Sequence, residues 1–225
     1  MNKDVVSYYD AIAAEYDNSR FGNSYGRFVD AEERRILDRI IGEKRGRQIL
    51  EMACGTGRLT GYATHGLDAS EEMMAFARKR HSGVRFVRTS ATATGFPDGM
   101  FDIVYSFHLL MHLDIGSVRQ LISEAYRILK PGGRLIIDIP SGKRRRLLRH
   151  EQQSWHGATA LTSDELKEMV SGKFSLHRSF GIMMLPVHRL SESLRRYLLP
   201  VDYALSNGCL KEYSSYLVFE LVKNK

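Results

Sequence analysis

One glycine-rich stretch decides the fold: Ile49-Leu50-Glu51-Met52-Ala53-Cys54-Gly55-Thr56-Gly57-Arg58-Leu59-Thr60. Residues 48–52 predict a short buried strand, residues 53–57 a tight turn, and residues 58–60 the start of a helix. A strand followed by such a turn and a helix places a ligand at the carboxyl end of a parallel sheet. Glycine suits the turn because a side chain would fill the ligand's space, and because such turns often need a positive φ.

Two common nucleotide-binding motifs do not fit this stretch. A P-loop needs Lys and then Ser or Thr directly after its second glycine, whereas Arg58 follows Gly57. A dinucleotide fingerprint needs G-x-G-x-x-G, whereas the third glycine, Gly61, comes one place late. The remaining pattern is Glu51-x-Ala53-x-Gly55-x-Gly57. It resembles the first motif of the class I S-adenosylmethionine (AdoMet)-dependent methyltransferases, with Ala in place of the first glycine.

The resemblance continues in family order over roughly residues 8–140. Residues 9–20 (YDAIAAEYDNSR) are similar to the N-terminal lid of the small-molecule enzymes. Residues 101–107 (FDIVYSF) are similar to the fourth strand, and residues 129–137 (LKPGGRLII) to the turn and fifth strand. The joint match implies an enzyme that uses AdoMet, releases S-adenosylhomocysteine and needs no metal.

The resemblance also implies how the cofactor is held. The small residues of the turn let the methionine moiety approach, Glu51 favours its ammonium group, and Asp68 accepts hydrogen bonds from the ribose. Ser90 stands where the family has Asp against the adenine, so that hydrogen bond lacks charge assistance. The full set of implied cofactor-binding residues is Tyr16, Arg20, Glu51, Ala53, Cys54, Gly55, Gly57, Asp68, Ala69, Met73, Ser90, Ala91, Thr92 and Phe107.

The segment between Gly57 and Asp68 is unusually short. It spans 11 positions, from 57 to 68, whereas the acidic residue usually comes about 20 residues after the glycines. This interval must hold a helix and most of a strand. We therefore expect the first crossover helix to be truncated to about a turn or two.

Two histidines follow the fourth predicted strand. His108 and His112 are four residues apart, so they would share one face of a helical turn. No Glu stands between them as in H-E-x-x-H and no third ligand is evident, so a metal site is not expected. His112 matches a position where the family places a histidine near the acceptor, which makes it the candidate general base. His108 is the weaker candidate, with a structural role as the alternative.

Composition describes one globular domain in this 225-residue chain. Two distant cysteines suggest neither a zinc site nor a disulfide framework, and a reducing cytoplasm is the expected location. No run of about 18 apolar residues predicts a membrane span, and no membrane partner is expected. The net charge of +7 fits either an anionic substrate or a solvated surface.

The predicted fold is α/β. It is a Rossmann-like, doubly wound, mostly parallel seven-stranded sheet with an antiparallel C-terminal strand pair. Residues 1–225 form a single domain: lid helices in 1–46, the AdoMet-binding core in 47–140, and an acceptor-side region in 141–225. That last region contains a basic run at 143–149 and a helical insertion at 185–212 before the last strand.

Three functions remain open at this point. The first is methyl transfer to an O or N atom of a small-molecule metabolite. This metabolite would be phosphorylated or sugar-like if the basic run at 143–149 borders its pocket. A homodimer is left open. The second is a tRNA or other nucleic-acid methyltransferase. It is disfavoured because no N-P-P-Y-type tetrapeptide and no separate RNA-binding module is present. The third is a catalytically impaired binding protein of the same fold.

Overall fold

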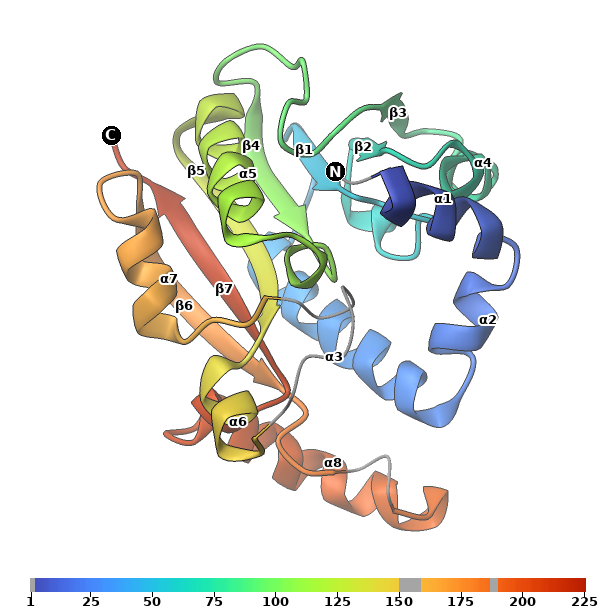
Figure 1. Cartoon of the computed structure of the whole chain (residues 1–225), viewed down its shortest axis with the longest axis vertical. Coiled ribbons are helices and arrows are strands. Elements are labelled where there is room, and N and C mark those ends of the chain that lie inside the picture. Colours follow the sequence, from blue (N-terminus) through green and yellow to red (C-terminus); the bar gives the residue numbers. More distant parts are fainter. Residues whose placement is uncertain (1–2, 150–158, 187–189) are drawn as a thin grey trace.

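Seven strands form one sheet. The computed structural model describes residues 3–149, 159–186 and 190–225. Within these residues the strand order is β3-β2-β1-β4-β5-β7-β6 (Figure 1). Strands β1 to β5 pair in parallel, and β7 runs antiparallel to both neighbours, which confirms the predicted sheet. The strands are β1 (Ile49–Met52), β2 (His65–Asp68), β3 (Arg85–Arg88), β4 (Phe101–Ser106), β5 (Leu129–Pro140), β6 (Phe174–Ile182) and β7 (Tyr216–Lys223).

The helices cover the sheet and one of its edges. They are α1 (Lys3–Ile12), α2 (Tyr16–Phe21), α3 (Ser24–Ile41), α4 (Glu71–Arg80), α5 (Ile115–Ile128), α6 (Gly142–Leu147), α7 (Ser163–Val170) and α8 (Glu192–Asn207). The described residues also form three short 3₁₀ turns: η1 (Thr60–Tyr62), η2 (Leu110–His112) and η4 (Lys211–Tyr213). Ser70, Asp114 and Thr162 accept hydrogen bonds from the first-turn N–H groups of α4, α5 and α7, as N-caps do.

Neighbouring strand residues point into two different cores, because side chains alternate across a sheet. Leu50 and Val104 pack with α5 and α7 on one face. Ile49 and Ile103 pack with α3 on the other. Both faces are therefore apolar, which explains the nearly continuous hydrophobic runs of the central strands.

The shortened first crossover is confirmed. Between the glycine turn and β2 the chain forms only the three-residue turn η1. The segment that resembles a lid forms the two helices α1 and α2. One boundary differs from the sequence-based expectation. Strand β5 begins at Leu129, directly after α5, so the Pro-Gly-Gly residues lie within the strand rather than before it.

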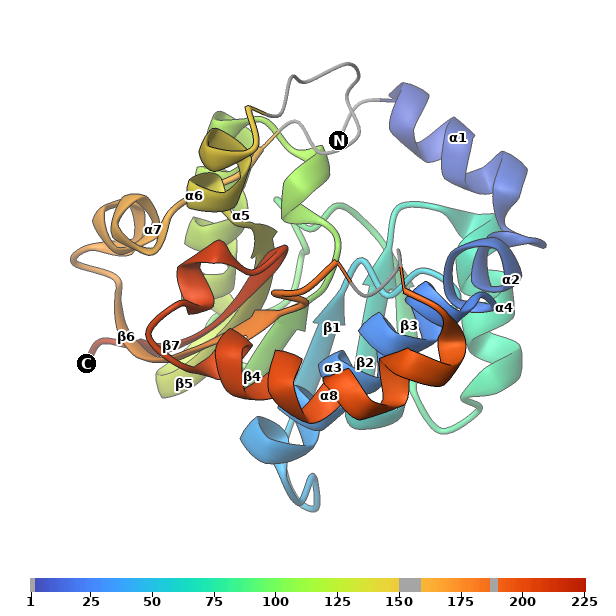
Figure 2. The same ribbon diagram turned by 90° about the horizontal axis from the view of Figure 1, so that it is seen from below.

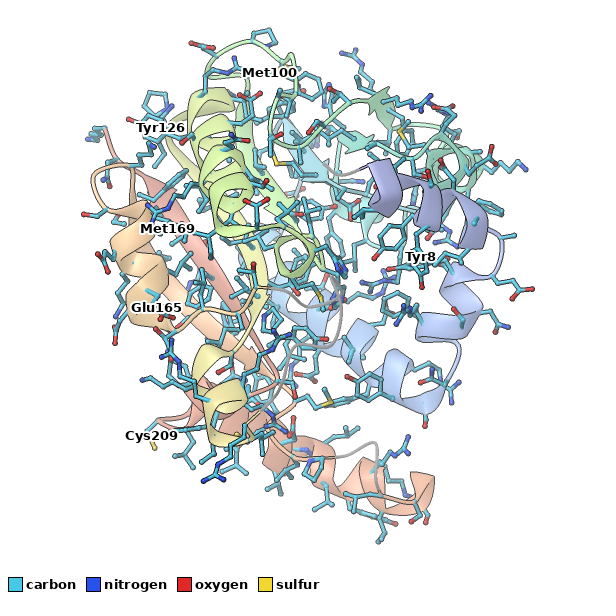
Figure 3. All side chains as sticks on the ribbon, in the orientation of Figure 1. Tyr8, Met100, Tyr126, Glu165, Met169 and Cys209 are labelled. Carbon is cyan, nitrogen blue, oxygen red and sulfur yellow. The ribbon has the colours of Figure 1, made fainter. Side chains whose placement is uncertain are left out.

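Helix α1 contacts α4 and lies past the carboxyl end of β2, on the side of the molecule where Figure 2 shows α2 and α4. The insertion before β7 is the helix α8, which packs against β6 and α3 on one face of the sheet. The ribbon of Figure 3 carries all described side chains and shows Cys209, just beyond α8, at the molecular surface. No helix among the described residues is both long and apolar enough to cross a membrane.

Candidate functional site

The glycine turn after β1 has a strained, tight backbone. Ala53, Gly55 and Gly57 all have positive φ, at 56°, 53° and 81°. A Cβ atom at Gly57 would lie 3.0 Å from Cα of Ala77 in α4, so a larger residue there would push the turn away from the helix. Glycine is thus required at position 57 both for conformation and for close packing.

Asp68, at the end of β2, holds this turn in place. Its carboxylate accepts hydrogen bonds from the N–H groups of Gly55 (2.8 Å) and Ser70 (2.9 Å). Burial raises the pKa of the Asp68 carboxyl, and the backbone hydrogen bonds oppose that shift. A carboxylate offers about four lone-pair positions. The carboxylate therefore keeps some acceptor capacity for donors on a ligand, such as hydroxyl groups.

A cleft of about 500 Å³, partly open to solvent, lies over the turn and the ends of β2 and β4. Most of its wall is apolar or aromatic, with Asp68 as its one carboxylate among the described residues. Its lining residues are Val5, Tyr9, Tyr16, Ala53, Gly55, Asp68, Met73, Phe107, His108, Leu109 and His112.

Helices α1 and α2 close over this cleft and are tied to both of its sides. Asp10 accepts a hydrogen bond from the Ser70 hydroxyl. Asp17 accepts one from the Thr56 hydroxyl (2.6 Å) and pairs with Arg80 of α4 (2.6 Å). The segment that resembles a family lid therefore lies where a lid would, in contact with the glycine turn.

Several residues expected to bind the cofactor do not line the cleft. Glu51 lies behind the turn, only 4% exposed, and accepts a hydrogen bond from the Thr60 hydroxyl. Its burial raises the pKa of the carboxyl to about 8. The other residues outside the cleft wall are Arg20, Cys54, Gly57, Ala69, Ser90, Ala91 and Thr92. Among them, the Ser90 hydroxyl lies 2.9 Å from that of Thr92.

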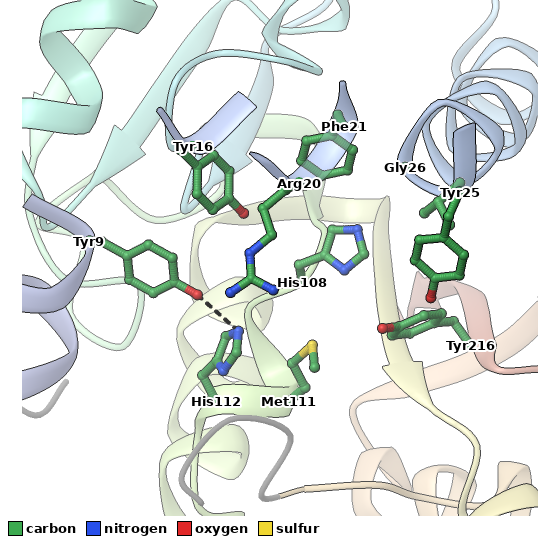
Figure 4. Close-up of a pocket in the computed structure, with 11 residues that line it drawn as sticks. Tyr9, Tyr16, Arg20, Phe21, Tyr25, Gly26, His108, Met111, His112 and Tyr216 are labelled. Carbon is green, nitrogen blue, oxygen red and sulfur yellow. Dashed lines mark hydrogen bonds between the residues drawn. The ribbon is translucent and has the colours of Figure 1, made fainter. Parts of the chain in front are cut away.

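A second pocket adjoins the cleft and shares four of its residues. It is partly open to solvent, and the empty space counted together with that opening is about 660 Å³. Five aromatic rings line it. Figure 4 shows Tyr25 and Tyr216 on one side, Tyr9 and His112 on the other, and the Arg20 guanidinium reaching between them. The lining residues are Tyr9, Tyr16, Arg20, Phe21, Tyr25, Gly26, Val29, His108, Met111, His112 and Tyr216.

His108 is held between two buried carboxylates. Its Nε2 lies 2.6 Å from Glu33 Oε1 and its Nδ1 lies 3.6 Å from Asp138 Oδ2. Although burial lowers the pKa of the imidazole, the two carboxylates raise it more, and the net pKa lies above its usual value. Because both ring nitrogens face buried carboxylates, the arrangement favours a structural role for His108 over that of a general base.

Glu33 also reaches the glycine turn. Its second oxygen pairs with Arg58 (2.6 Å), which in turn pairs with Asp30 (2.5 Å). The two cations lower the pKa of Glu33 against the effect of its burial. A chain of paired charges therefore connects the turn below the cleft with the wall of the second pocket.

Glu33, His108 and Asp138 also form a candidate metal-binding cluster among the described residues, with donor atoms within 4.8 Å of one another. However, Glu33 meets Nε2 whereas Asp138 meets Nδ1. The lone pairs of these two nitrogens point apart, so one ion would bind only one of them. The arrangement fits an imidazolium between two carboxylates.

His112 has a different environment, because the lid contacts it. Its Nε2 lies 3.1 Å from the hydroxyl oxygen of Tyr9 in α1. Both residues line both pockets, at the junction between them. His112 therefore lies where a group that enters the second pocket would meet one bound in the cleft.

The comparisons with known proteins agree with this architecture. Residues 50–137 match the family model described as a methyltransferase domain. The chain is 33% identical over 144 residues to a demethylmenaquinone methyltransferase of Thermus thermophilus, a match that covers 57% of this chain and 62% of that one. It is 31% identical over 128 residues to phosphoethanolamine N-methyltransferase 1 of Zea mays, covering 52% of this chain and 25% of the maize protein. The chain thus spans less than two thirds of these relatives.

Solved structures match over nearly the whole chain. A methyltransferase from Thermotoga maritima, described as a possible histamine N-methyltransferase, has a TM-score of 0.70 at 21% identity and covers 96% of this chain and 98% of its own. The [4+2]-cyclase SpnF has the same TM-score at 16% identity, covering 98% and 95%. The fold is that of the class I AdoMet-dependent methyltransferases. Residues 50–137 are the part of the chain that matches the methyltransferase-domain family model.

Proposed function

We propose that the protein is an AdoMet-dependent methyltransferase that acts on an O or N atom of a small molecule, in the cytoplasm. The observation that carries this proposal is the pair of adjoining pockets under one lid. The first contains the glycine turn and Asp68, and the second contains aromatic rings and His112. Because SpnF has the same fold but is described as a [4+2]-cyclase, the fold alone does not establish methyl transfer.

The cleft residues fit the AdoMet that the family implies. The Asp68 carboxylate lines the cleft and keeps acceptor capacity for ribose hydroxyls beside its bonds to the backbone. Ala53 and Gly55 leave space along the turn, while Met73 and Phe107 supply apolar walls. When bound, AdoMet supplies the methyl group to a nucleophile. Glu51 is better suited to support the turn through Thr60 than to bind the ammonium group directly.

The lid and the pocket junction would orient the reactants and exclude water. Tyr9 and Tyr16 form part of both walls, so their rings separate the reacting groups from solvent. Alignment of two reactants in a dry site can supply about 7–11 kcal/mol of a reaction barrier. His112 is the candidate general base for an acceptor that carries a proton, such as a hydroxyl.

The second pocket indicates the kind of acceptor. Its five aromatic rings favour a flat or apolar group, and Arg20 is its one Lys or Arg among the described lining residues. This favours an aromatic or apolar acceptor with at most one anionic group over a sugar-like metabolite.

A screen for the release of S-adenosylhomocysteine tests this proposal. Purified protein, AdoMet and a library of phenols, amines, carboxylates and phosphorylated metabolites would be incubated together, with tRNA as a separate arm. Release with a small molecule, abolished in Asp68→Ala but retained in Asp164→Asn, would support the proposal; Asp164 is 77% exposed in α7. Salt-sensitive methylation of tRNA alone would contradict it.

A further inference from the structure

Exposed apolar side chains gather on one part of the molecule. Ten large hydrophobic side chains are exposed among the described residues, and eight of them lie between residues 147 and 213. Leu147 and Leu148 at the end of α6 are 68% and 64% exposed. Along α8, Leu194, Tyr197 and Val201 are 54%, 65% and 47% exposed, and their spacing places them on one face of the helix.

The same segments hold most of the excess positive charge. Residues 141–149 and 191–213 contain eight Lys or Arg residues against three acidic ones, a net charge of +5 out of the chain's +7. We call these two segments the basic apolar surface. They lie along the lower side of the molecule in Figure 1, the side that Figure 2 views, and η4 contacts both α6 and α8.

This surface adjoins the second pocket. Tyr216 of β7 pairs with Pro140 of β5, and α6 begins two residues after Pro140, at Gly142. At the other segment, Arg195 of α8 donates a hydrogen bond to Ser24, the neighbour of Tyr25. Both elements of the surface are thus anchored beside the Tyr25 and Tyr216 wall of the pocket.

We propose that the basic apolar surface docks the protein onto an anionic lipid bilayer, with α8 lying in the interface. An amphipathic helix with Arg beside an exposed Leu and Tyr stripe has the composition of interfacial helices. Each Lys or Arg near an anionic surface adds about 1 kcal/mol to binding. The expectation of no membrane partner rested on the lack of a spanning segment, whereas docking needs none.

Two other occupants fit the surface less well. A second copy of the chain in a twofold dimer would bring two faces of the same charge, +5 each, against one another. A nucleic acid would pair with the cations but would leave Leu147, Leu148 and Leu194 exposed to water. A lipid surface satisfies both the charge and the apolar side chains.

Cys209 provides a labelling site for a test of vesicle binding. Cys209 is exposed between α8 and η4, whereas Cys54 is buried, so a polarity-sensitive dye would label Cys209 selectively. Titration with vesicles of phosphatidylcholine and phosphatidylglycerol is expected to shift the dye emission to the blue and to pellet the protein. Vesicles of phosphatidylcholine alone are expected to bind at least about tenfold more weakly.

Matched variants separate the apolar and charged contributions. Leu147→Ser with Leu148→Ser, and Arg149→Gln with Arg196→Gln, are each expected to weaken vesicle binding about tenfold or more. Val87→Ser with Ile115→Ser replaces the two exposed hydrophobics outside residues 147–213. Arg85→Gln with Arg119→Gln removes two exposed cations elsewhere. Both control variants are expected to bind as the wild type does.

The proposal would be overturned by an absence of binding to anionic vesicles at low salt, or by equal losses in the surface and control variants. It would also be overturned if the surface variants abolished tRNA binding or dimerisation while the protein ignored vesicles. The docking proposal does not rest on the proposed function. Vesicle binding needs no AdoMet, so a protein that binds vesicles but not AdoMet would refute the proposed function alone.

Discussion

The cleft and the basic apolar surface use their charged residues in opposite ways. Around the cleft, Arg58 and His108 are paired with buried carboxylates, and Glu33, which contacts both, is 1% exposed. On the surface, Arg149 and Arg196 are exposed. Buried pairs fix the geometry of neighbouring groups, whereas exposed cations stay available for a partner. The charges around the cleft are thus arranged to hold fixed positions, whereas those of the basic apolar surface are arranged as the proposed docking requires.

The largest effect is expected from breaking the buried charge chain. Glu33→Gln leaves Arg58 and His108 without their shared carboxylate. Removal of one partner from a buried ion pair costs about 3–5 kcal/mol. Urea denaturation would measure the free energy of unfolding, with Glu71→Gln, at a 46% exposed ion pair, as the control. A loss no larger than in the control would show that the chain of charges adds nothing to stability.

The two histidines provide the next contrast. His112→Ala is expected to lower kcat by about 100-fold or more for an acceptor that carries a proton, because general-base catalysis contributes 10²–10⁴-fold. His108→Gln keeps a polar side chain but removes the cation between Glu33 and Asp138, so its main expected effect is on stability. Single-turnover kinetics across pH would separate the two. Equal kcat values in both variants would remove His112 from its proposed role.

The pH dependence of stability tests how Glu51 supports the glycine turn. Its pKa is raised to about 8 by burial, above its usual value near 4.5. The folded state therefore binds a proton that the unfolded state lacks between these values, so this group makes stability fall as pH rises from about 5 to 8. The limiting slope for one proton is about 1.4 kcal/mol per pH unit. Glu51→Gln is expected to flatten that fall, and an unchanged slope would show that Glu51 titrates normally.

The smallest effect is expected on the basic apolar surface. Leu147→Ser with Leu148→Ser replaces side chains that are already 68% and 64% exposed, so the stability in water should change by less than about 0.5 kcal/mol per site. Thermal unfolding of the wild type and the variant would measure it. A loss of several kcal/mol would mean that these leucines support the fold rather than a contact.

The sheet could be predicted from sequence because local patterns specify it. Apolar runs ended by small residues marked the strands, and the 11 positions between Gly57 and Asp68 predicted the truncated crossover, which is the turn η1. The cleft residues Gly55, Asp68 and Phe107 followed from the resemblance and lie in its wall.

The charge chain and the second pocket could not be predicted in the same way. Glu33 and Asp138 are 105 positions apart and meet at His108 only through the packing of α3 against the sheet. A faint signal was present, since each is an acidic residue within an apolar stripe, Val29 to Ile36 and Leu135 to Ile139. Tyr216 reaches the pocket only because β7 pairs with β5 in the sheet. That pairing depends on the order of the strands and not on any pattern near Tyr216.

Calorimetric titration of AdoMet tests the central claim most directly. Two hydrogen bonds from ribose hydroxyls to a carboxylate contribute about 1.5 kcal/mol or more each, so Asp68→Ala should weaken binding by about 100-fold. The control variant Asp164→Asn removes a carboxylate that is 77% exposed, and it should bind AdoMet as the wild type does. Tight binding by the wild type with this loss in Asp68→Ala is the predicted result. A wild-type protein that takes up no AdoMet at millimolar concentration, or an Asp68→Ala variant with unchanged affinity, would contradict the account.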